Sequence, residues 1–372
     1  MAYWSTNILI TFALCILLAG ILIPQILLIA YRKNLFDEVD ERKIHKGAIP
    51  RLGGFAFQPV IMLSIALMLG ANIVMGYPQF AIAFTNDLLL MIATFCSVLL
   101  LYLVGIADDL IGIKYRAKFV VQIICAILII YGGAWFDSLG GIFGINELPV
   151  FIGYPFTAII IVFLINAINL IDGIDGLASG LSSIAVIIFG ISFFVLGDYA
   201  LSILAFATLG VLCPFFYYNV FGNVKKHSKI FMGDAGSLTI GVLLCILGIK
   251  LYTADTGELD FNPVVLAFSP LIVPCFDVVR VYMLRIRQHR SPFLPDKNHI
   301  HHKLLAAGLK PRLAMITIIS VSVAFTLFNL AISSVINLNL VVIIDILLWV
   351  MANIWISRVI ARRNAELESQ KA

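Results

Sequence analysis

Residues 166–180 read "NAINLIDGIDGLASG", with two asparagines and two aspartates among three glycines. Strongly apolar segments stand on both sides, "FTAIIIVFLI" at 156–165 and "LSSIAVIIFGISFFVL" at 181–196. Two apolar segments joined by a polar turn are typical of two membrane-spanning helices that meet at a membrane surface. Because a charged side chain at the bilayer centre costs about 2.5–3.5 kcal/mol, we expect the aspartates to line a water-filled cleft or to pair with cations.

The whole chain has the composition of an integral membrane protein. Of its 372 residues, 61% are hydrophobic and only 12% are charged, whereas soluble domains carry about 25% charged residues. Apolar segments of roughly 20 residues recur, which is the length that crosses the bilayer as a helix. We therefore predict an all-α polytopic membrane protein with a single domain over 1–372 and about eleven spans. The expected spans are 8–31, 55–75, 88–107, 119–135, 150–168, 177–196, 200–221, 236–252, 262–283, 313–335 and 338–358.

The basic residues predict the orientation of these spans. Lys and Arg gather in alternate loops, and only Lys250 falls toward the other side. Since positively charged loops stay in the cytoplasm, we expect the N-terminus outside, the C-terminus inside and the active-site cleft on the cytoplasmic face. The formal net charge of +4 then follows from topology, and it does not indicate nucleic-acid binding.

The polar residues of the opening stretch recur at every third position: Asn166, Asn169, Asp172 and Asp175. If the preceding span stays helical through them, they share one slowly drifting face. The glycines of the stretch allow a tight turn and let a ligand approach the backbone. The alternative is a plain polar turn between two spans.

A second stretch, "GIADDLIGIKYRAKF" at 105–119, ends an expected span with Asp108 and Asp109. Adjacent carboxylates repel each other unless a cation lies near them. Mg²⁺ is commonly held by one or two carboxylates together with substrate phosphates, and Lys118 could hold a phosphate by its charge. The alternative is a helix end with a solvated cluster of charges.

A third stretch, "YYNVFGNVKKHSKIFMGDAGSLTIG" at 217–241, places Asp234 between glycines at the start of an expected span. A carboxylate there suits the helix dipole, so N-capping is the structural alternative to metal binding. Phe231 is either a residue that stacks on a base or a packing residue.

A fourth stretch, "LRIRQHRSPFLPDKNHIHHKLLAAGLKPR" at 284–312, contains four of the six histidines, and three of them, His299, His301 and His302, lie close together in the sequence. Zinc is one interpretation, but no cysteine accompanies the histidines, and clustered carboxylates elsewhere favour a hard cation. Beside Arg290 and its neighbouring arginines, the imidazoles fit diphosphate binding better. A basic loop against lipid headgroups is the alternative.

A fifth stretch, "FDEVDERKIHKGAIPRLGG" at 36–54, contributes Asp37 to the candidate site residues.

In this order, the aspartate pair followed by a lysine, "NAINLIDGIDGLA" and "FMGDAGSL" resemble the polyprenyl-phosphate N-acetylhexosamine-1-phosphate transferases of glycosyltransferase family 4. The resemblance runs from about Asp37 to Leu305. It implies transfer of sugar-1-phosphate from a cytoplasmic UDP-N-acetylhexosamine to undecaprenyl phosphate in the bilayer, with release of UMP. It also implies Mg²⁺ as cofactor, with Mn²⁺ as a substitute, and the inner (cytoplasmic) membrane as location. A homodimer is an alternative to a monomer.

The resemblance further implies roles for individual residues. Asp234 and Asn169 correspond to metal ligands, and Asp108 is the candidate for positioning or deprotonating the lipid phosphate. The candidate catalytic residues are Asp108, Asp109, Asp172, Asp175 and His302. The candidate substrate-binding residues are Asp37, Lys118, Asn219, Phe231, Arg290, His299 and His301.

The last loop indicates the branch of the family. "PDKNHIHHKL" resembles the branch that uses UDP-N-acetylglucosamine, whereas the muramoyl-pentapeptide branch has three consecutive histidines after a Pro-Phe pair. That branch remains the alternative within the family.

From other classes, a secondary transporter is disfavoured because the polar residues gather at one face and not at the midplane. A lipid-binding scaffold leaves the carboxylates unexplained. Asp345, inside the last expected span, is expected to pair within the bundle or between copies.

Overall fold

The computed structural model of the protein describes residues 1–36, 49–255, 262–289, 291 and 298–370. These residues form α-helices and short 3₁₀ helices, and no strand occurs among them, so the all-α prediction is confirmed for this part of the chain. The elements are α1 (Ala2–Lys33), η1 (Gly53–Ala56), α2 (Phe57–Val74), α3 (Gln79–Thr85), α4 (Leu88–Ile111), α5 (Tyr115–Tyr131), η2 (Ile142–Gly144), α6 (Val150–Ile171), α7 (Leu177–Leu196), α8 (Tyr199–Phe221), η3 (Val224–Lys226), α9 (Gly233–Tyr252), α10 (Pro263–Phe268), η4 (Ser269–Leu271), α11 (Ile272–Arg287), α12 (Ile300–Ala306), α13 (Pro311–Ile332) and α14 (Leu338–Ser369).

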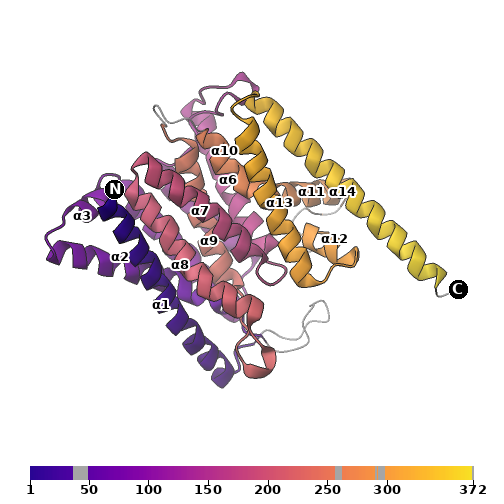
Figure 1. Ribbon diagram of the computed structural model, residues 1–372, viewed down its shortest axis with the longest axis horizontal. Helices are drawn as coiled ribbons and strands as arrows, with labels where there is room; N and C mark the ends of the chain where they lie inside the picture. Colours follow the sequence, from indigo (N-terminus) through magenta and orange to yellow (C-terminus); the bar gives the residue numbers. More distant parts are fainter. Residues whose placement is uncertain (37–48, 256–261, 290, 292–297, 371–372) are drawn as a thin grey trace.

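Helix α9 is the centre of the bundle (Figure 1). It packs against α4, α6 and α7, and 89% of its membrane-length segment is buried, compared with 28% for α1 and α14 at the rim. Its sequence is apolar on all sides, which is typical of a helix with neighbours all round. The first turn of α9, which carries Asp234, therefore lies at the centre of one end of the bundle.

Ten helical segments among the described residues are long and apolar enough to cross a membrane, which agrees with a multi-pass membrane protein. At the expected span 119–135 stands α5, with only 17 residues. At 1.5 Å per residue it is about 26 Å long, somewhat less than the hydrocarbon thickness of about 30 Å. The count of eleven and the orientation of the termini stay predictions.

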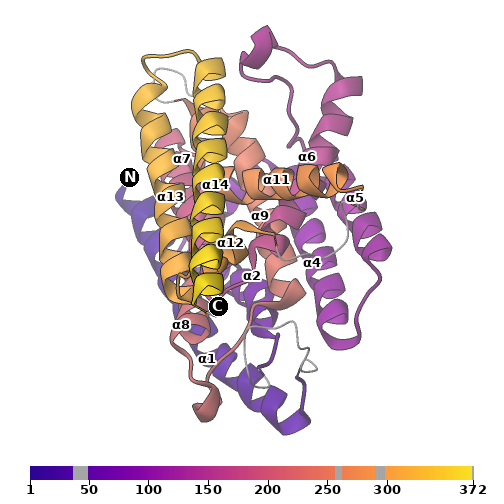
Figure 2. The same ribbon diagram turned by 90° about the vertical axis from the view of Figure 1, so that its right-hand side faces the viewer.

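The expected span 262–283 is not one straight helix. It is divided into α10, η4 and α11, and the division falls at Pro270, which has no N–H to continue the helical hydrogen bonds. Beyond it, α11 runs across the direction of α13 and α14 (Figure 2). The prediction of a membrane span over these residues agrees with the structure, since Pro263–Arg287 is one of the ten candidate spans. The sequence-based bounds gave no sign of the break at Pro270.

Polar side chains connect this division to the last two helices. Asn329 Nδ2 on α13 lies 3.0 Å from Ser269 Oγ and 2.9 Å from Asp345 Oδ2 on α14. Asp345 is fully buried. Asp345 was expected to pair either within the bundle or between copies of the chain, and in the structure it pairs within the bundle, with Asn329.

Backbone contacts hold the start of α9 between two other elements. Gly53 N donates to Phe231 O over 2.9 Å, and Gly54 N donates to Met232 O over 2.8 Å. A Cβ atom at Gly54 would lie 2.0 Å from Gly236 N, and one at Gly105 on α4 would lie 2.3 Å from Ala235 Cα. These distances leave no room for a side chain, so η1 and α4 fix the position of this end of α9.

Candidate active site

An acidic cluster forms where α4 ends and α9 begins, and it contains Asp108, Asp109, Lys118, Asn169 and Asp234. The Lys118 Nζ atom lies 3.0 Å from Asp108 Oδ2 and 2.8 Å from Asp234 Oδ2. One ammonium group thus joins carboxylates that are more than 100 positions apart in the sequence. The structure brings together the second and third polar stretches, as the sequence predicted.

Asp109 binds the backbone at the start of α9. Its Oδ1 accepts a hydrogen bond from Asp234 N over 2.8 Å, and its Oδ2 accepts one from Ala235 N over 2.9 Å. The first N–H groups of a helix have no partner within the helix and attract anions. Asp109 therefore caps α9 from α4. The capping role that was the alternative for Asp234 belongs to Asp109.

Asn169 orients Asp234 from α6. Its Nδ2 donates to Asp234 Oδ1 over 2.6 Å and to Ser237 Oγ over 2.8 Å. Asn166, one turn earlier, instead donates to Gln122 Oε1 on α5 over 2.7 Å. Since α6 ends at Ile171, the expected shared face does not continue to Asp172 and Asp175, which lie in the turn beyond the helix.

The turn after α6 is held by a buried lysine and an asparagine. Lys229 Nζ lies 2.6 Å from Asp175 Oδ2. Asn219 Oδ1 accepts from Gly176 N over 2.6 Å, and its Nδ2 donates to Ile230 O over 2.8 Å. Gly176 has a φ of 76°, a conformation that favours glycine. Both the oxygen and the nitrogen of the Asn219 amide form hydrogen bonds within the protein, so Asn219 stabilises the turn.

Asp172 has an environment that suits proton transfer near neutral pH. Burial raises the pKa of Asp172 to about 7, the charge of Arg51 opposes this, and Asp234 and Asp175 add to it. A carboxyl group with such a pKa in a cleft is a candidate functional group.

A second group, the histidine cluster, is organised by Asp277 on α11 and contains Asp277, Arg280, His299, His301 and His302. The Asp277 Oδ2 atom lies 2.8 Å from His299 Nδ1, and its Oδ1 accepts from Ile300 N over 3.0 Å. Arg280 Nη2 lies 2.7 Å from Asp277 Oδ1. Asp277 was not among the predicted site residues, although a fully buried aspartate inside an apolar segment is a signal that could have identified it.

Helix α12 brings this cluster against the opening stretch of the sequence. A Cβ atom at Gly173 would lie 2.1 Å from His301 Nε2, so the imidazole sits directly on the backbone of the turn. The rings of His299 and His301 are parallel with centroids 5.8 Å apart, and the rings of His301 and His302 are 4.2 Å apart. Burial, together with His302 and His299, lowers the pKa of His301 to about 3. His301 is therefore neutral at physiological pH.

The remaining candidates divide into described and undescribed residues. Phe231 is half-buried, as is His302 of the histidine cluster. The backbone N–H of Phe231 donates to Pro50 O over 2.9 Å. Asp37 and Arg290 lie outside the described residues, so the roles expected of them stay predictions.

The donors of the acidic cluster fit a hard divalent cation shared with a substrate. Among the described residues, no three His, Cys, Asp or Glu side chains are grouped closely enough to hold a metal by themselves. Mg²⁺ typically uses one or two carboxylates, and substrate phosphates and water complete its shell. Asp108 and Asp234, bridged by one lysine, are such a pair.

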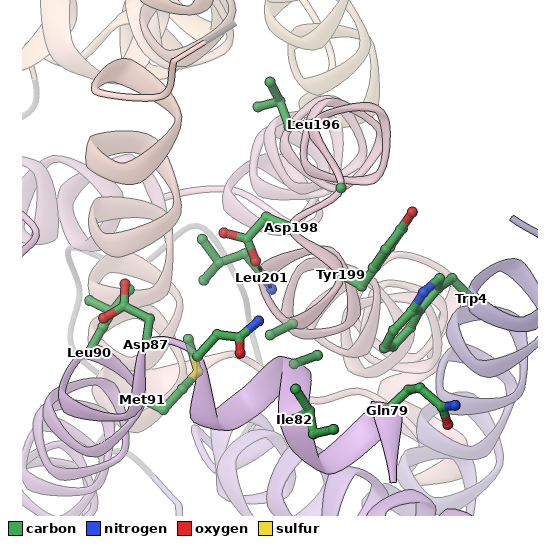
Figure 3. A pocket seen from close by; sticks show the side chains of 14 residues that line it. Trp4, Gln79, Ile82, Asp87, Leu90, Met91, Leu196, Asp198, Tyr199 and Leu201 are labelled. Carbon is green, nitrogen blue, oxygen red and sulfur yellow. Dashed lines mark hydrogen bonds between the residues drawn. The ribbon is translucent and has the colours of Figure 1, made fainter. Parts of the chain in front are cut away.

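A different pocket lies at the other end of α4 (Figure 3). It has a volume of about 480 Å³, and its lining includes Asp87 and Asp198. Lys250 Nζ lies 3.1 Å from Asp87 Oδ2, and Asp198 accepts from Leu201 N at the start of α8. Lys250, the exception in the charge distribution, is thus already paired. No Lys, Arg or His is among the described residues that line this pocket, so the acidic cluster is the better candidate for a diphosphate site.

Comparison with known proteins identifies the same region of the chain as the acidic cluster does. The model of "Glycosyl transferase family 4" matches residues 91–252, which include all members of the acidic cluster. The chain is 32% identical over 292 residues to the undecaprenyl-phosphate alpha-N-acetylglucosaminyl 1-phosphate transferase of Salmonella typhi, covering 78% of this chain and 74% of the relative. It has the same identity and coverage with the enzyme of that name from Escherichia coli K12. It is 29% identical to a probable undecaprenyl-phosphate N-acetylglucosaminyl 1-phosphate transferase of Bacillus subtilis, covering 94% and 92% of the two chains.

Proposed function

The chain belongs to glycosyl transferase family 4, and we propose that it transfers N-acetylglucosamine-1-phosphate from a UDP-sugar to undecaprenyl phosphate. The names of its relatives support this activity. The observation that carries the proposal is the bridge from Lys118 to Asp108 and Asp234, together with the packing of His301 of α12 on the turn at Gly173. It offers acidic and basic groups at one place for two phosphate-bearing substrates.

The reaction exchanges one phosphoanhydride for another. An oxygen of undecaprenyl phosphate attacks the sugar-bearing phosphorus of the UDP-sugar and forms a new P–O bond. The P–O bond between that phosphorus and the bridging oxygen of the diphosphate breaks, and UMP leaves with the bond's electron pair. The protein takes little part in the covalent chemistry, so catalysis consists chiefly of positioning the substrates and stabilising their charge.

The residues of the two clusters divide this work. Lys118 holds a phosphoryl oxygen of the diphosphate, and it exchanges carboxylate partners for that oxygen when substrate binds. Asp108 positions the acceptor phosphate and accepts its proton where the phosphate arrives as the monoanion. His302 donates a hydrogen bond to the diphosphate from α12. Asp109 acts through Asp234, since it accepts a hydrogen bond from the Asp234 backbone N–H. Asn169 orients Asp234 with its amide N–H and has its oxygen left for a metal.

Asp108, Asp234 and the oxygen of Asn169 would hold Mg²⁺, or Mn²⁺ in its place. When bound, such an ion neutralises phosphoryl oxygens as charge shifts toward the leaving group. The fit rests on the donor chemistry, because carboxylate and amide oxygens are hard ligands that suit this ion.

The proposed location is the inner membrane, with the two clusters on the cytoplasmic face, where UDP-sugars are made. Single cysteines near Lys226 and near Asp255, each in a variant without other reactive cysteines, test the orientation. In intact cells an impermeant thiol reagent should label the cysteine near Asp255 and spare the one near Lys226. The reverse pattern would overturn the orientation.

The activity itself is tested with the purified full-length chain, Mg²⁺, undecaprenyl phosphate and a panel of UDP-sugars. We expect UMP release with UDP-N-acetylglucosamine and a lipid product whose mass has increased by the sugar phosphate. Product only with UDP-N-acetylmuramoyl-pentapeptide would move the chain to the other branch. No UMP from any donor, with ion-coupled uptake of a solute into vesicles, would support a transporter instead.

A further inference from the structure

A large groove lies behind the histidine cluster, between α11, α12 and α14. Its volume is about 800 Å³. One wall is apolar and includes Phe276 and Met283 on α11 and Ile346 and Trp349 on α14. Figure 2 shows that α11 crosses the direction of α14. The groove contains no member of the acidic cluster.

The polar lining of the groove is basic. Arg280, Arg287, Lys303 and Arg358 contribute to it, and no acidic residue lines it among those the structure describes. Arg287 and Arg358 are exposed, whereas Arg280 and Lys303 are half-buried. An apolar wall next to several cationic groups is complementary to a molecule with a hydrocarbon chain and an anionic head.

Two of the deeper groups have donors that the protein does not satisfy. Arg280 Nε and Trp349 Nε1 have no hydrogen-bond partner among the described residues, although both atoms are buried. Among the described residues, the acceptors of Lys303 Nζ are neutral, Asn353 O at 3.0 Å and Asn353 Oδ1 at 3.1 Å. Burial and the charge of Arg280 lower the pKa of Lys303 to about 8. The inner part of the groove therefore has spare donors and positive charge.

We propose that this groove binds one anionic phospholipid, with its phosphate against Arg287, Arg358 and Lys303. The acyl chains lie along the apolar wall of α11 and α14. Basic pockets between membrane helices at the cytoplasmic side are known to bind such headgroups. This binding site is independent of the proposed transfer reaction.

The position of α12 argues against undecaprenyl phosphate as the occupant. His301 faces the Gly173 turn, while Lys303, two residues later, lines the groove. The helix thus stands between the groove and the acidic cluster, where an acceptor phosphate must react. A lipid in the groove contacts α12 from behind and does not reach the reacting groups.

The test is a titration of the full-length purified chain with phosphatidylglycerol, followed by native mass spectrometry. The variant R287Q/R358Q removes two exposed groove charges. The control R32Q/R362Q removes two exposed charges, at the end of α1 and on α14, that do not line the groove. At about 1 kcal/mol for each basic residue, the groove variant should bind phosphatidylglycerol roughly 30-fold more weakly. The control should bind like the unmodified chain, and phosphatidylcholine should not be retained.

Three outcomes would overturn the proposal. Equal weakening in both variants would mean that only general surface charge attracts the lipid. Equal retention of phosphatidylcholine would mean that the headgroup charge is not recognised. Displacement of phosphatidylglycerol by an equal concentration of undecaprenyl phosphate would assign the groove to the acceptor.

Discussion

The acidic cluster and the histidine cluster are both built on aspartates, but their charge balance differs. In the first, three carboxylates, those of Asp108, Asp109 and Asp234, lie together, and Lys118 forms ion pairs with two of them. In the second, Asp277 is paired with Arg280 and with the ring of His299. The acidic cluster is therefore rich in carboxylate oxygens, the ligands that a hard divalent cation prefers. The histidine cluster is already balanced and can offer N–H groups to an anion.

The two clusters also differ in what holds them. The acidic cluster lies at helix ends fixed by backbone contacts around α9. The histidine cluster lies on α12, a helix of seven residues, and depends on a single buried carboxylate of α11. We therefore expect substitutions to affect chemistry in the first cluster and the local structure in the second.

Removing the central carboxylate of the acidic cluster should have the largest effect. Asp234→Ala deletes the acceptor shared by Lys118 and Asn169, and the rate of UMP release should fall by at least about 10³-fold. Asp198→Ala, a capping aspartate at the other end of the bundle, is the control and should retain most of the rate. Near-normal turnover of the Asp234 variant would remove the metal assignment.

Removing the central carboxylate of the histidine cluster should instead lower stability. Asp277→Ala leaves the half-buried Arg280 and the buried His299 without their anion, a loss of roughly 3–5 kcal/mol. Thermal unfolding in detergent and proteolysis of the loop before α12 measure it, with Asp277→Asn as the milder change. If Asp277→Ala unfolds like the unmodified chain but has lost turnover, the carboxylate has a direct chemical role.

A histidine that faces the substrate should affect rate without affecting the metal requirement. His302→Ala should lower the rate of UMP release by roughly 10²–10³-fold, the usual loss for one preorganised donor. His302→Gln keeps a donor and should lose less. The dependence of rate on Mg²⁺ concentration should stay the same in both variants. Inhibition by a zinc-selective chelator that only zinc reverses would show that the histidines hold a metal.

The smallest effect is expected in the pH dependence of the rate. Because the pKa of Asp172 is raised to about 7, its carboxyl group is mostly neutral at pH 6 and mostly ionised at pH 8. If the ionised form is the active one, the rate should rise by up to about tenfold over this range. Asp172→Asn should give a lower rate without that rise. An unchanged pH profile in the variant would assign the rise to another group.

Much of the fold could be predicted from composition, because membrane helices are long apolar segments and their charged ends are easy to recognise. The acidic cluster could also be predicted, since carboxylates excluded from the bilayer must gather where water is. Asp108, Asp109 and Asp234 were expected on one face for that reason, and the structure brings Asp108 and Asp234 to the same lysine, Lys118.

What the sequence did not reveal depends on contacts between distant segments. Nothing local distinguishes Asp108 from Asp109, yet only Asp109 caps α9. From the sequence, Asn219 was expected to bind a ligand, but its amide group forms hydrogen bonds to the backbone of Gly176 and of Ile230. The contact of His301 with Gly173 joins residues more than 120 positions apart. Such pairings follow from the packing of the bundle, which periodicity and composition do not specify.

The crowding at the start of α9 has a consequence for genetics. Alanine is one base change away from any glycine codon, yet a methyl group at Gly54 or Gly105 would meet backbone atoms at 2.0 and 2.3 Å. A side chain that clashes with another side chain can be relieved by a second mutation that shortens the neighbour. A clash with backbone offers no such partner, because every allele carries the same main chain. Alleles with alanine at these positions should behave as null mutations without second-site suppressors, although neither glycine has any chemistry of its own.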